Sequence, residues 1–143
     1  MNKELLLSNQ ICFLVYRLDR EIQARYRPLL DTLGVTYPQY LVLLVLWEYQ
    51  SLEVGKLCTI LGLDTGTISP LLKRMQNAGL IQKIRSRKDE RVVTILLTEK
   101  GKNLQEEALK IPKQIYDCLF KESEEYVALK QLLSTYVSRL SSS

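Results

Sequence analysis

Apolar residues recur every three or four positions along most of the chain, which is the period of an amphipathic helix. The first such pattern begins beyond Ser8 and ends before Gly34. Serine is a common N-cap residue, and a glycine often ends a helix. We therefore predict one long helix over residues 8–33. Its apolar stripe is longer than a small core needs, which is typical of a surface that packs against a second chain.

The next pattern predicts the centre of the domain. Thr36 and Gln39 have the spacing of a capping box, and the proline between them is harmless in a first helical turn. A nearly uninterrupted apolar run to Trp47 then indicates a buried helix. Two shorter patterns, over 54–61 and 65–78, are separated by a turn that contains a glycine. This order is a helix-turn-helix, whose second helix is the recognition helix.

Two β-branched runs, 80–84 and 92–97, lie on either side of a basic turn and predict a two-stranded hairpin. A helix should follow from Thr98 to about residue 120, with a kink at Pro112, and a last helix should cover 122–140. The predicted fold class is mostly α with a small β-hairpin wing. Its parts are a winged helix-turn-helix DNA-binding region (36–98) and two dimerisation segments (8–33 and 99–140), within a single domain of residues 1–143.

The terminal helices also predict the oligomeric state. Pairing them in a two-fold homodimer would bury both apolar faces and place two recognition helices about one DNA turn apart.

Charge is concentrated in one part of the chain. Residues 64–91 contain seven Lys/Arg and three Asp/Glu, whereas the remaining residues contain thirteen of each. The net charge of +4 therefore lies entirely in the predicted recognition helix and wing. Such a concentration indicates a surface for a polyanion such as double-stranded DNA.

Composition excludes several kinds of site. The chain has no histidine, which removes Ser-His-Asp and Cys-His catalysis and the commonest metal ligand. Its three cysteines lack the spacing of a zinc site or a disulfide framework. We therefore expect no catalytic residue, cofactor or metal. No apolar run reaches about 18 residues and no signal peptide is evident, so we expect a cytoplasmic protein that does not bind membranes.

Four motifs carry a resemblance to a known family. They are Asp64–Met75 (DTGTISPLLKRM), Gly79–Ile81 (GLI), Lys88–Arg91 (KDER) and Leu97–Gly101 (LTEKG). Over essentially the whole chain, this arrangement resembles the MarR family of bacterial transcription regulators. Within that family, an early cysteine set among tyrosines resembles the organic-hydroperoxide-sensing (OhrR-like) repressors, with Cys12, Tyr26 and Tyr37 at the matching positions.

The resemblance implies roles for individual residues. It implies that five residues face the major groove of a pseudo-palindromic operator: Thr65, Thr67, Ser69, Pro70 and Lys73. It implies that Arg91 reaches the minor groove while Asp89 holds the wing in shape. Hydroxyls at a helix start suit phosphates or base edges, and arginine suits a narrow minor groove. The other candidates for DNA contact in these two segments are Asp64, Gly66, Arg74, Arg85, Arg87 and Lys88.

Cys12 is the candidate sensor. A thiol near a helix N-terminus feels the positive end of the helix dipole, which favours the thiolate that attacks peroxides. Tyr16 lies one turn further on the same face. Tyr26 lies about 21 Å further along the helix at the usual rise, so it could approach only the Cys12 of a second chain. The resemblance places Tyr26 and Tyr37 in that cross-subunit role.

Other interpretations remain open at this point. Cys12 could be an ordinary core residue. The resemblance to the sensor group implies that Cys118 could resolve oxidised Cys12 into an intersubunit disulfide; the alternative is an inert, half-buried thiol. Cys58 is expected to serve packing. A regulator of the same fold could instead respond to a phenolic or aromatic acid, with its carboxylate received by Arg17, Arg20 or Arg25. A thiol peroxidase is disfavoured, because the chain lacks histidine, a CxxC motif and any βαβ pattern.

Overall fold

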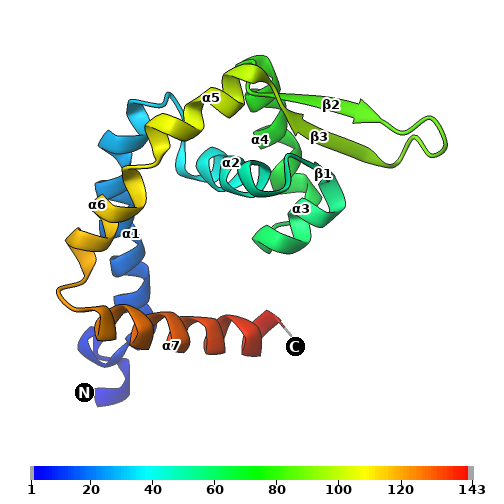
Figure 1. Cartoon of the computed structure of the whole chain (residues 1–143). Coiled ribbons are helices and arrows are strands. Elements are labelled where there is room, and N and C mark those ends of the chain that lie inside the picture. The colour runs from blue at the N-terminus through cyan, green and yellow to red at the C-terminus, as the bar shows by residue number, and fades with distance from the viewer. Residues whose placement is uncertain (1, 142–143) are drawn as a thin grey trace. The chain divides into compact units, whose positions relative to one another are not determined.

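The computed structural model describes residues 2–141, and the chain divides between Leu109 and Lys110 into two compact units. The elements of the first unit are two 3₁₀ turns (Lys3–Leu5 and Leu7–Asn9), helices α1 (Ile11–Asp31), α2 (Tyr37–Tyr49), α3 (Val54–Leu61), α4 (Thr65–Asn77) and α5 (Glu99–Ala108), and strands β1 (Ser51–Glu53), β2 (Ile81–Arg85) and β3 (Val93–Leu97) (Figure 1). The second unit contains α6 (Ile111–Leu119) and α7 (Ser123–Ser141). Among the described helices, none combines the length and apolarity needed to cross a bilayer.

Helix α2 forms the centre of the first unit, as predicted. Its capping box is complete, because the Thr36 hydroxyl accepts from the Gln39 amide while the Gln39 side chain accepts from the Thr36 amide. The apolar residues of α2 are distributed around the helix, so it shows no single hydrophobic face. Its buried residues are Tyr40, Val42, Leu43, Val45 and Leu46.

Helix α1 begins at Ile11, so the predicted start at Ser8 was wrong. Ser8 lies in a 3₁₀ turn instead. The Asn9 side-chain amide donates to the Lys3 carbonyl at 2.6 Å, and the Gln10 amide donates to the Glu4 carbonyl at 2.7 Å. These side-chain bonds hold residues 3–10 in a local turn that competes with helix. As a consequence, Cys12 is the second residue of the helix rather than one full turn inside it.

The sheet has three strands where the sequence predicted two. All pairs are antiparallel in the order β1-β3-β2, and Leu52 of β1 lies opposite Ile95 of β3. Strand β1 alternates, with one buried residue between two exposed ones, but its three residues are too few for this pattern to be recognised in the sequence. Strands β2 and β3 extend beyond it as the wing, which projects from the helices of the first unit in Figure 1.

The predicted helix over 98–120 is two helices. Helix α5 ends at Ala108, and Pro112 lies in the first turn of α6. Proline has no N–H to donate to the carbonyl four residues earlier, so the helix breaks there instead of bending. Within the second unit, the Tyr116, Phe120 and Tyr126 rings lie 5.2–5.5 Å apart and pack the start of α7 against α6. The predicted fold class, mostly helical with a small β wing, is confirmed.

Candidate nucleic-acid interface and candidate thiol site

Helix α4 separates its apolar and polar residues cleanly between two faces. Ile68, Leu71, Leu72 and Met75 are buried at the spacing of one helical face. Every DNA-contact candidate on or next to this helix is exposed: Asp64, Thr65, Gly66, Thr67, Ser69, Pro70, Lys73 and Arg74. The helix is therefore anchored by one side while the other side is available to a large partner.

Asp64 begins α4 as its N-cap. Its carboxylate accepts from the Thr67 amide at 2.7 Å, and this hydrogen bond lowers the pKa of Asp64 below its usual value. A negative charge at this position also matches the positive end of the helix dipole. The Asp64 side chain is thus engaged in holding the first turn, where Thr65 and Thr67 present their hydroxyls.

A groove of about 790 Å³ runs between α4 and the wing. Thr65, Ser69 and Lys73 lie on its α4 side, and Arg85 and Arg91 lie on its wing side. The structure thus brings five of the predicted residues together, whereas Thr67, Pro70, Arg74, Arg87 and Lys88 do not line this groove. Its excess of positive charge suits a phosphate backbone.

Sequence reasoning missed three polar residues of the same groove: Gln76, Lys83 and Glu53. Gln76 lies three positions after Lys73 on α4, and Lys83 lies two positions before Arg85 on β2. Both spacings return to the same face of a helix or a strand, so the periodicity could have identified them. Glu53 contributes the one carboxylate among the described lining residues.

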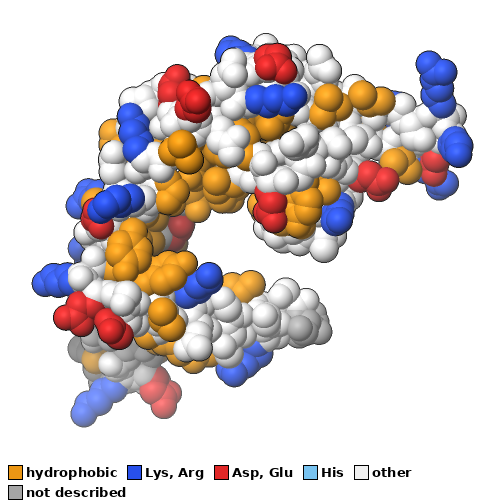
Figure 2. Space-filling model, viewed as in Figure 1, with side chains coloured by type: hydrophobic (Ala, Val, Ile, Leu, Met, Phe, Trp, Pro, Cys, Tyr) orange, Lys and Arg blue, Asp and Glu red, His pale blue; other side chains and the backbone are white. Residues whose placement is uncertain are grey.

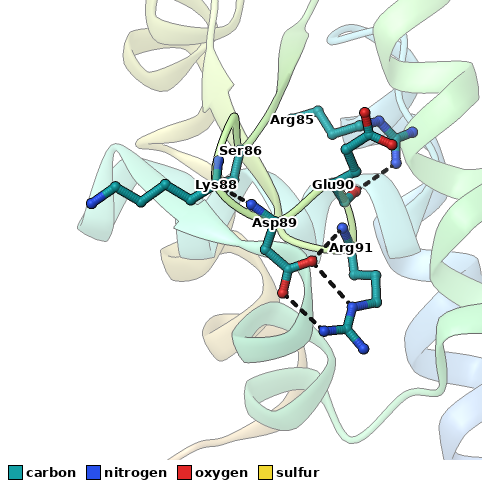
Figure 3. A network of polar contacts seen from close by, with 6 residues as sticks. All are labelled: Arg85, Ser86, Lys88, Asp89, Glu90 and Arg91. Atoms are coloured by element: carbon teal, nitrogen blue, oxygen red, sulfur yellow. Dashed lines mark hydrogen bonds and ion pairs between the residues drawn. The ribbon is translucent and has the colours of Figure 1, made fainter.

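The wing is held together by a polar network, drawn in Figure 3. The Asp89 carboxylate accepts from the Arg91 backbone amide at 3.0 Å and from the Arg91 guanidinium at 3.1 and 3.3 Å. These bonds, the guanidinium first, lower the pKa of Asp89. The Ser86 hydroxyl accepts from the amides of Lys88 and Asp89, and Arg85 donates to the Glu90 carbonyl. The loop is thereby shaped from within, and the basic side chains at its tip gather in blue in Figure 2.

Cys12 is exposed in the first turn of α1, so it belongs to no core of the single chain. Its neighbours along the helix are exposed and apolar, with Ile11 at 74%, Leu14 at 61% and Val15 at 56% of full exposure. Tyr16, on the same face one turn on, is also exposed, and the Arg20 guanidinium lies 5.6 Å from the centre of its ring. The surroundings of the thiol are therefore accessible, apolar and close to a phenol.

Tyr26 and Tyr37 lie together at the other end of α1, with ring centres 4.8 Å apart. Both side chains are half-buried, and the fully buried Tyr40 lies 5.9 Å from Tyr26. Burial, followed by the nearby Tyr37 and Tyr40, raises the pKa of Tyr26 to about 12. The pKa of Tyr37 is also raised, first by burial and then by Asp19. Both phenols therefore keep their protons at neutral pH and can donate hydrogen bonds.

The structure brings the two phenols together but does not bring Cys12 to them within one chain. Cys12 and Tyr26 are fourteen residues apart on one continuous helix, which is about 21 Å at the usual rise. Of the other cysteines, Cys58 is half-buried on α3, and Cys118 is exposed on α6 in the second unit.

Titration of Tyr26 gives a first prediction. Because the pKa of Tyr26 is higher in the folded than in the unfolded chain, its contribution to the free energy of unfolding is fully present below the ordinary tyrosine pKa near 10. This contribution is lost as the pH rises from 10 through 12. We expect ultraviolet titration to show one phenol ionising near pH 12 that is absent from Tyr26→Phe. Urea unfolding midpoints should also fall more steeply between pH 10 and 12 in the parent chain than in that variant. An identical alkaline profile for both proteins would contradict the assignment.

A second groove, of about 480 Å³, lies along α1 itself. Phe13, Arg17, Arg20 and Arg27 line it, so two of the three arginines proposed to receive a ligand carboxylate are present, and Arg25 is not. No group of three or more potential metal-ligating side chains occurs among residues 2–141.

Comparisons with known proteins identify a family and several relatives. A family model described as transcriptional regulator SarA/Rot matches residues 24–108. The chain is 48% identical to the organic hydroperoxide resistance transcriptional regulator of Bacillus subtilis (strain 168), over 94% of this chain and 91% of that protein.

Two solved structures of AbfR, a protein of Staphylococcus epidermidis, are similar over nearly the whole chain. Reduced AbfR bound to DNA is 34% identical with a TM-score of 0.82, covering 99% of this chain and 97% of the other. Disulfide-formed AbfR is 31% identical with a TM-score of 0.64, covering 92% of each chain.

Proposed function

This chain belongs to the winged-helix MarR/SarA-type transcriptional regulators, and from that premise we propose that it is a DNA-binding repressor released from its operator when an organic hydroperoxide oxidises Cys12. The observation that carries the proposal is the exposed thiol in the first turn of α1. A regulator that must meet an external oxidant needs such an accessible sulfur. The likeness to a regulator named for organic hydroperoxide resistance supports the choice of oxidant.

DNA binding is proposed to use both walls of the α4–wing groove. Helix α4 would enter the major groove with Thr65 and Ser69 leading, while Arg91 reaches the adjacent minor groove. Lys73, Lys83 and Arg85 would neutralise the phosphate backbone between them. The similarity to AbfR, solved bound to DNA in its reduced state, supports this mode. Such a regulator would act in the cytoplasm, where bacterial DNA lies.

A homodimer is proposed as the working state, with residues 1–143 forming one functional domain in each subunit. Helix α7 has no buried residue in the single chain, and it exposes a row of apolar side chains: Val127, Leu132, Leu133, Tyr136 and Val137. Helix α1 exposes Ile11, Leu14, Val15 and Leu18. Exposed apolar surface of this extent is unusual for a monomer and indicates a partner surface.

Sedimentation equilibrium tests the dimer. At micromolar concentration we expect twice the mass of one chain. A paired Leu133→Glu and Val137→Glu replacement on α7 should shift the protein toward the monomer, because it places charge in the proposed interface. Glu124→Gln, at an exposed position near the start of the same helix, serves as the control. A monomeric parent chain would remove the cross-subunit arrangement of Cys12 and Tyr26.

The chemistry of the switch follows from thiol reactivity. The Cys12 thiolate attacks the terminal, hydroxyl oxygen of the hydroperoxide, an S–O bond forms as the O–O bond breaks, and the alkoxide leaves and takes a proton from water to become the alcohol. The sulfur is oxidised by two electrons to sulfenic acid. In the dimer, Tyr26 and Tyr37 of one subunit would donate hydrogen bonds to the thiolate of the other. The apolar residues around Cys12 would favour organic hydroperoxides over hydrogen peroxide.

The sulfenic acid then has two possible fates. Cys118 is exposed and can serve as the resolving thiol of an intersubunit disulfide, or a small cellular thiol can take that role. The likeness to disulfide-formed AbfR supports the first possibility. Non-reducing gels of the hydroperoxide-treated protein separate the two, because only the first produces a covalent dimer that disappears in Cys118→Ser.

A mobility shift on the operator tests the whole proposal. We expect the reduced protein to retain the chain's own upstream DNA, cumene hydroperoxide to release it, and dithiothreitol to restore binding. If the protein still retains the DNA after the hydroperoxide has oxidised Cys12, the proposal is contradicted.

The groove along α1 keeps ligand sensing as a second candidate, because Arg17 and Arg20 lie there beside Phe13. Release by salicylate without oxidant, and persisting in Cys12→Ser, would favour it. Peroxidase activity is not part of the proposal, since one oxidation per signal is enough. Sustained consumption of peroxide in the presence of a thiol reductant would contradict this.

A further inference from the structure

Trp47 connects the Tyr26–Tyr37 pair, through Tyr40, to the helix that follows the wing. Its indole N–H, on α2, donates to the Gly101 carbonyl on α5 at 3.0 Å. The indole ring also contacts Tyr40 edge-on, with ring centres 6.3 Å apart. The indole is half-buried, and the bond spans fifty-four positions in sequence. It therefore links α2 to α5, two helices that are far apart in the sequence.

Side chains at the start of α5 bind the end of α4, the proposed recognition helix, through hydrogen bonds. The Thr98 hydroxyl donates to the Gly79 carbonyl at 2.6 Å, and the Lys100 ammonium donates to the Ala78 carbonyl at 2.9 Å. These carbonyls follow the last turn of α4, where carbonyl groups have no intrahelical donor. We call this group of residues the clasp: Thr98, Lys100 and Gly101.

The absence of a side chain at Gly101 allows the clasp to pack directly against the Leu80 backbone. A Cβ atom at this position would overlap the Leu80 carbonyl oxygen, so no other residue fits there without a shift of the backbone. The residue is held on both sides, since its amide donates to the Thr98 hydroxyl while its carbonyl accepts from Trp47. A displacement of the indole therefore acts on a tightly packed backbone and not on a loose loop.

Aromatic contact is also continuous from Trp47 to the Tyr26–Tyr37 pair. Tyr40 packs against the indole, and both Tyr26 and Tyr37 pack against Tyr40, at 5.9 and 6.3 Å between ring centres. All four rings belong to α1 and α2 of the first unit. Packed rings transmit displacement because a dense interior does not deform continuously.

We propose that Trp47 is a positioning residue that couples the Tyr26–Tyr37 pair to the recognition helix through the clasp. When the two phenols shift, Tyr40 and the indole shift with them, the bond to Gly101 weakens, and the clasp changes the orientation of α4. The part of this proposal that concerns oxidation rests on the proposed function of Cys12. The part that links Trp47 to α4 does not.

Fluorescence tests both parts separately, because Trp47 is the only tryptophan in the chain. We expect emission to change when the reduced protein binds a duplex of its own upstream DNA, which reports the link through the clasp. We also expect it to change when cumene hydroperoxide is added without DNA, and this change should be absent from Cys12→Ser. Lys100→Met, at an exposed position, should reduce the first change and leave the second intact.

Trp47→Phe tests the coupling itself, since it removes the indole N–H and keeps an aromatic ring. The measured quantity is the ratio of operator affinities of the reduced and the oxidised protein. We expect this ratio to fall at least about tenfold, with circular dichroism unchanged. Tyr49→Phe removes a polar group from an exposed aromatic residue at the end of the same helix and should leave the ratio unchanged.

The outcomes separate this inference from the proposed function. If hydroperoxide releases both the parent chain and Trp47→Phe equally, and emission is insensitive to DNA, the coupling role is wrong while the redox function stands. If hydroperoxide releases neither but emission responds to DNA and Lys100→Met removes that response, the redox function is wrong while the link between Trp47 and α4 stands. If Trp47→Phe is unfolded, the Lys100→Met emission experiment decides.

Discussion

Cys12→Ser is expected to bind operator DNA as tightly as the parent chain and to ignore organic hydroperoxide. Serine keeps the size and exposure of the side chain but cannot form a sulfenic acid. Cys12 lies on α1, away from the α4–wing groove that carries the basic residues. We therefore expect affinities of the two reduced proteins within about threefold, since a surface substitution usually costs within about 0.5 kcal/mol.

The response to oxidant should differ far more. A hydroperoxide that lowers the affinity of the parent chain about 100-fold shifts the binding free energy by about 2.7 kcal/mol. In Cys12→Ser this shift should vanish. Mobility shifts and fluorescence anisotropy across a hydroperoxide titration measure it. Cys58→Ser is the matched control, because this half-buried thiol on α3 should contribute packing alone and leave the response intact.

Normal release of Cys12→Ser by hydroperoxide would move the sensor elsewhere. A response lost instead in Cys58→Ser would implicate the helix-turn-helix directly, because α3 packs against α4. A response lost in both Cys12→Ser and Cys118→Ser would indicate that the disulfide, rather than the sulfenic acid, releases the DNA. Each result thus assigns the chemistry to a different sulfur or a different oxidation step.

The elements that sequence predicted well are those with strong local signals. Helix α3 begins and ends where predicted, and α4 is correct to within one residue, because its cap and its apolar spacing agree. Strand β1 was missed because a three-residue strand is defined by its partner β3, far along the chain. The start of α1 was misplaced because Asn9 and Gln10 bond backward to a turn, and sequence periodicity does not show that competition.

In the candidate site too, the features with local sequence signals were predictable, and those that depend on distant partners were not. That the basic residues of α4 are exposed followed from the helical period, and the motif pointed to Asp89 and Arg91. The contact between Tyr26 and Tyr37 joins the ends of two helices, so it depends on the turn between α1 and α2. Trp47 attracted no functional interpretation because its run of apolar neighbours predicts only burial. Its bond to Gly101 depends on tertiary packing that no local pattern encodes.

Arg91→Ala is expected to weaken operator binding by about 10- to 100-fold, which corresponds to about 1–3 kcal/mol. The Arg91 side chain is 91% exposed, so folding needs little from it. Its guanidinium is nevertheless held by both carboxylate oxygens of Asp89, which fixes its direction before DNA arrives. Preorganisation of this kind lowers the entropic cost of inserting an arginine into a minor groove.

The effect of the net charge of the wing can be separated from the orientation of the Arg91 side chain, because Asp89 and Arg91 carry opposite charges. Asp89→Asn makes the wing more positive, so simple attraction to phosphate predicts tighter binding. If Asp89 instead orients Arg91, the same variant should bind about tenfold more weakly despite its added charge. Lys88→Ala, at the exposed tip outside the groove, should lower affinity only modestly and in the same proportion for every sequence. Anisotropy titrations at several salt concentrations measure all three variants. Tighter binding by Asp89→Asn would show that the wing attracts DNA through charge alone, whereas unchanged affinity in Arg91→Ala would show that Arg91 contributes nothing to binding. Either result would leave α4 as the element that discriminates between sequences.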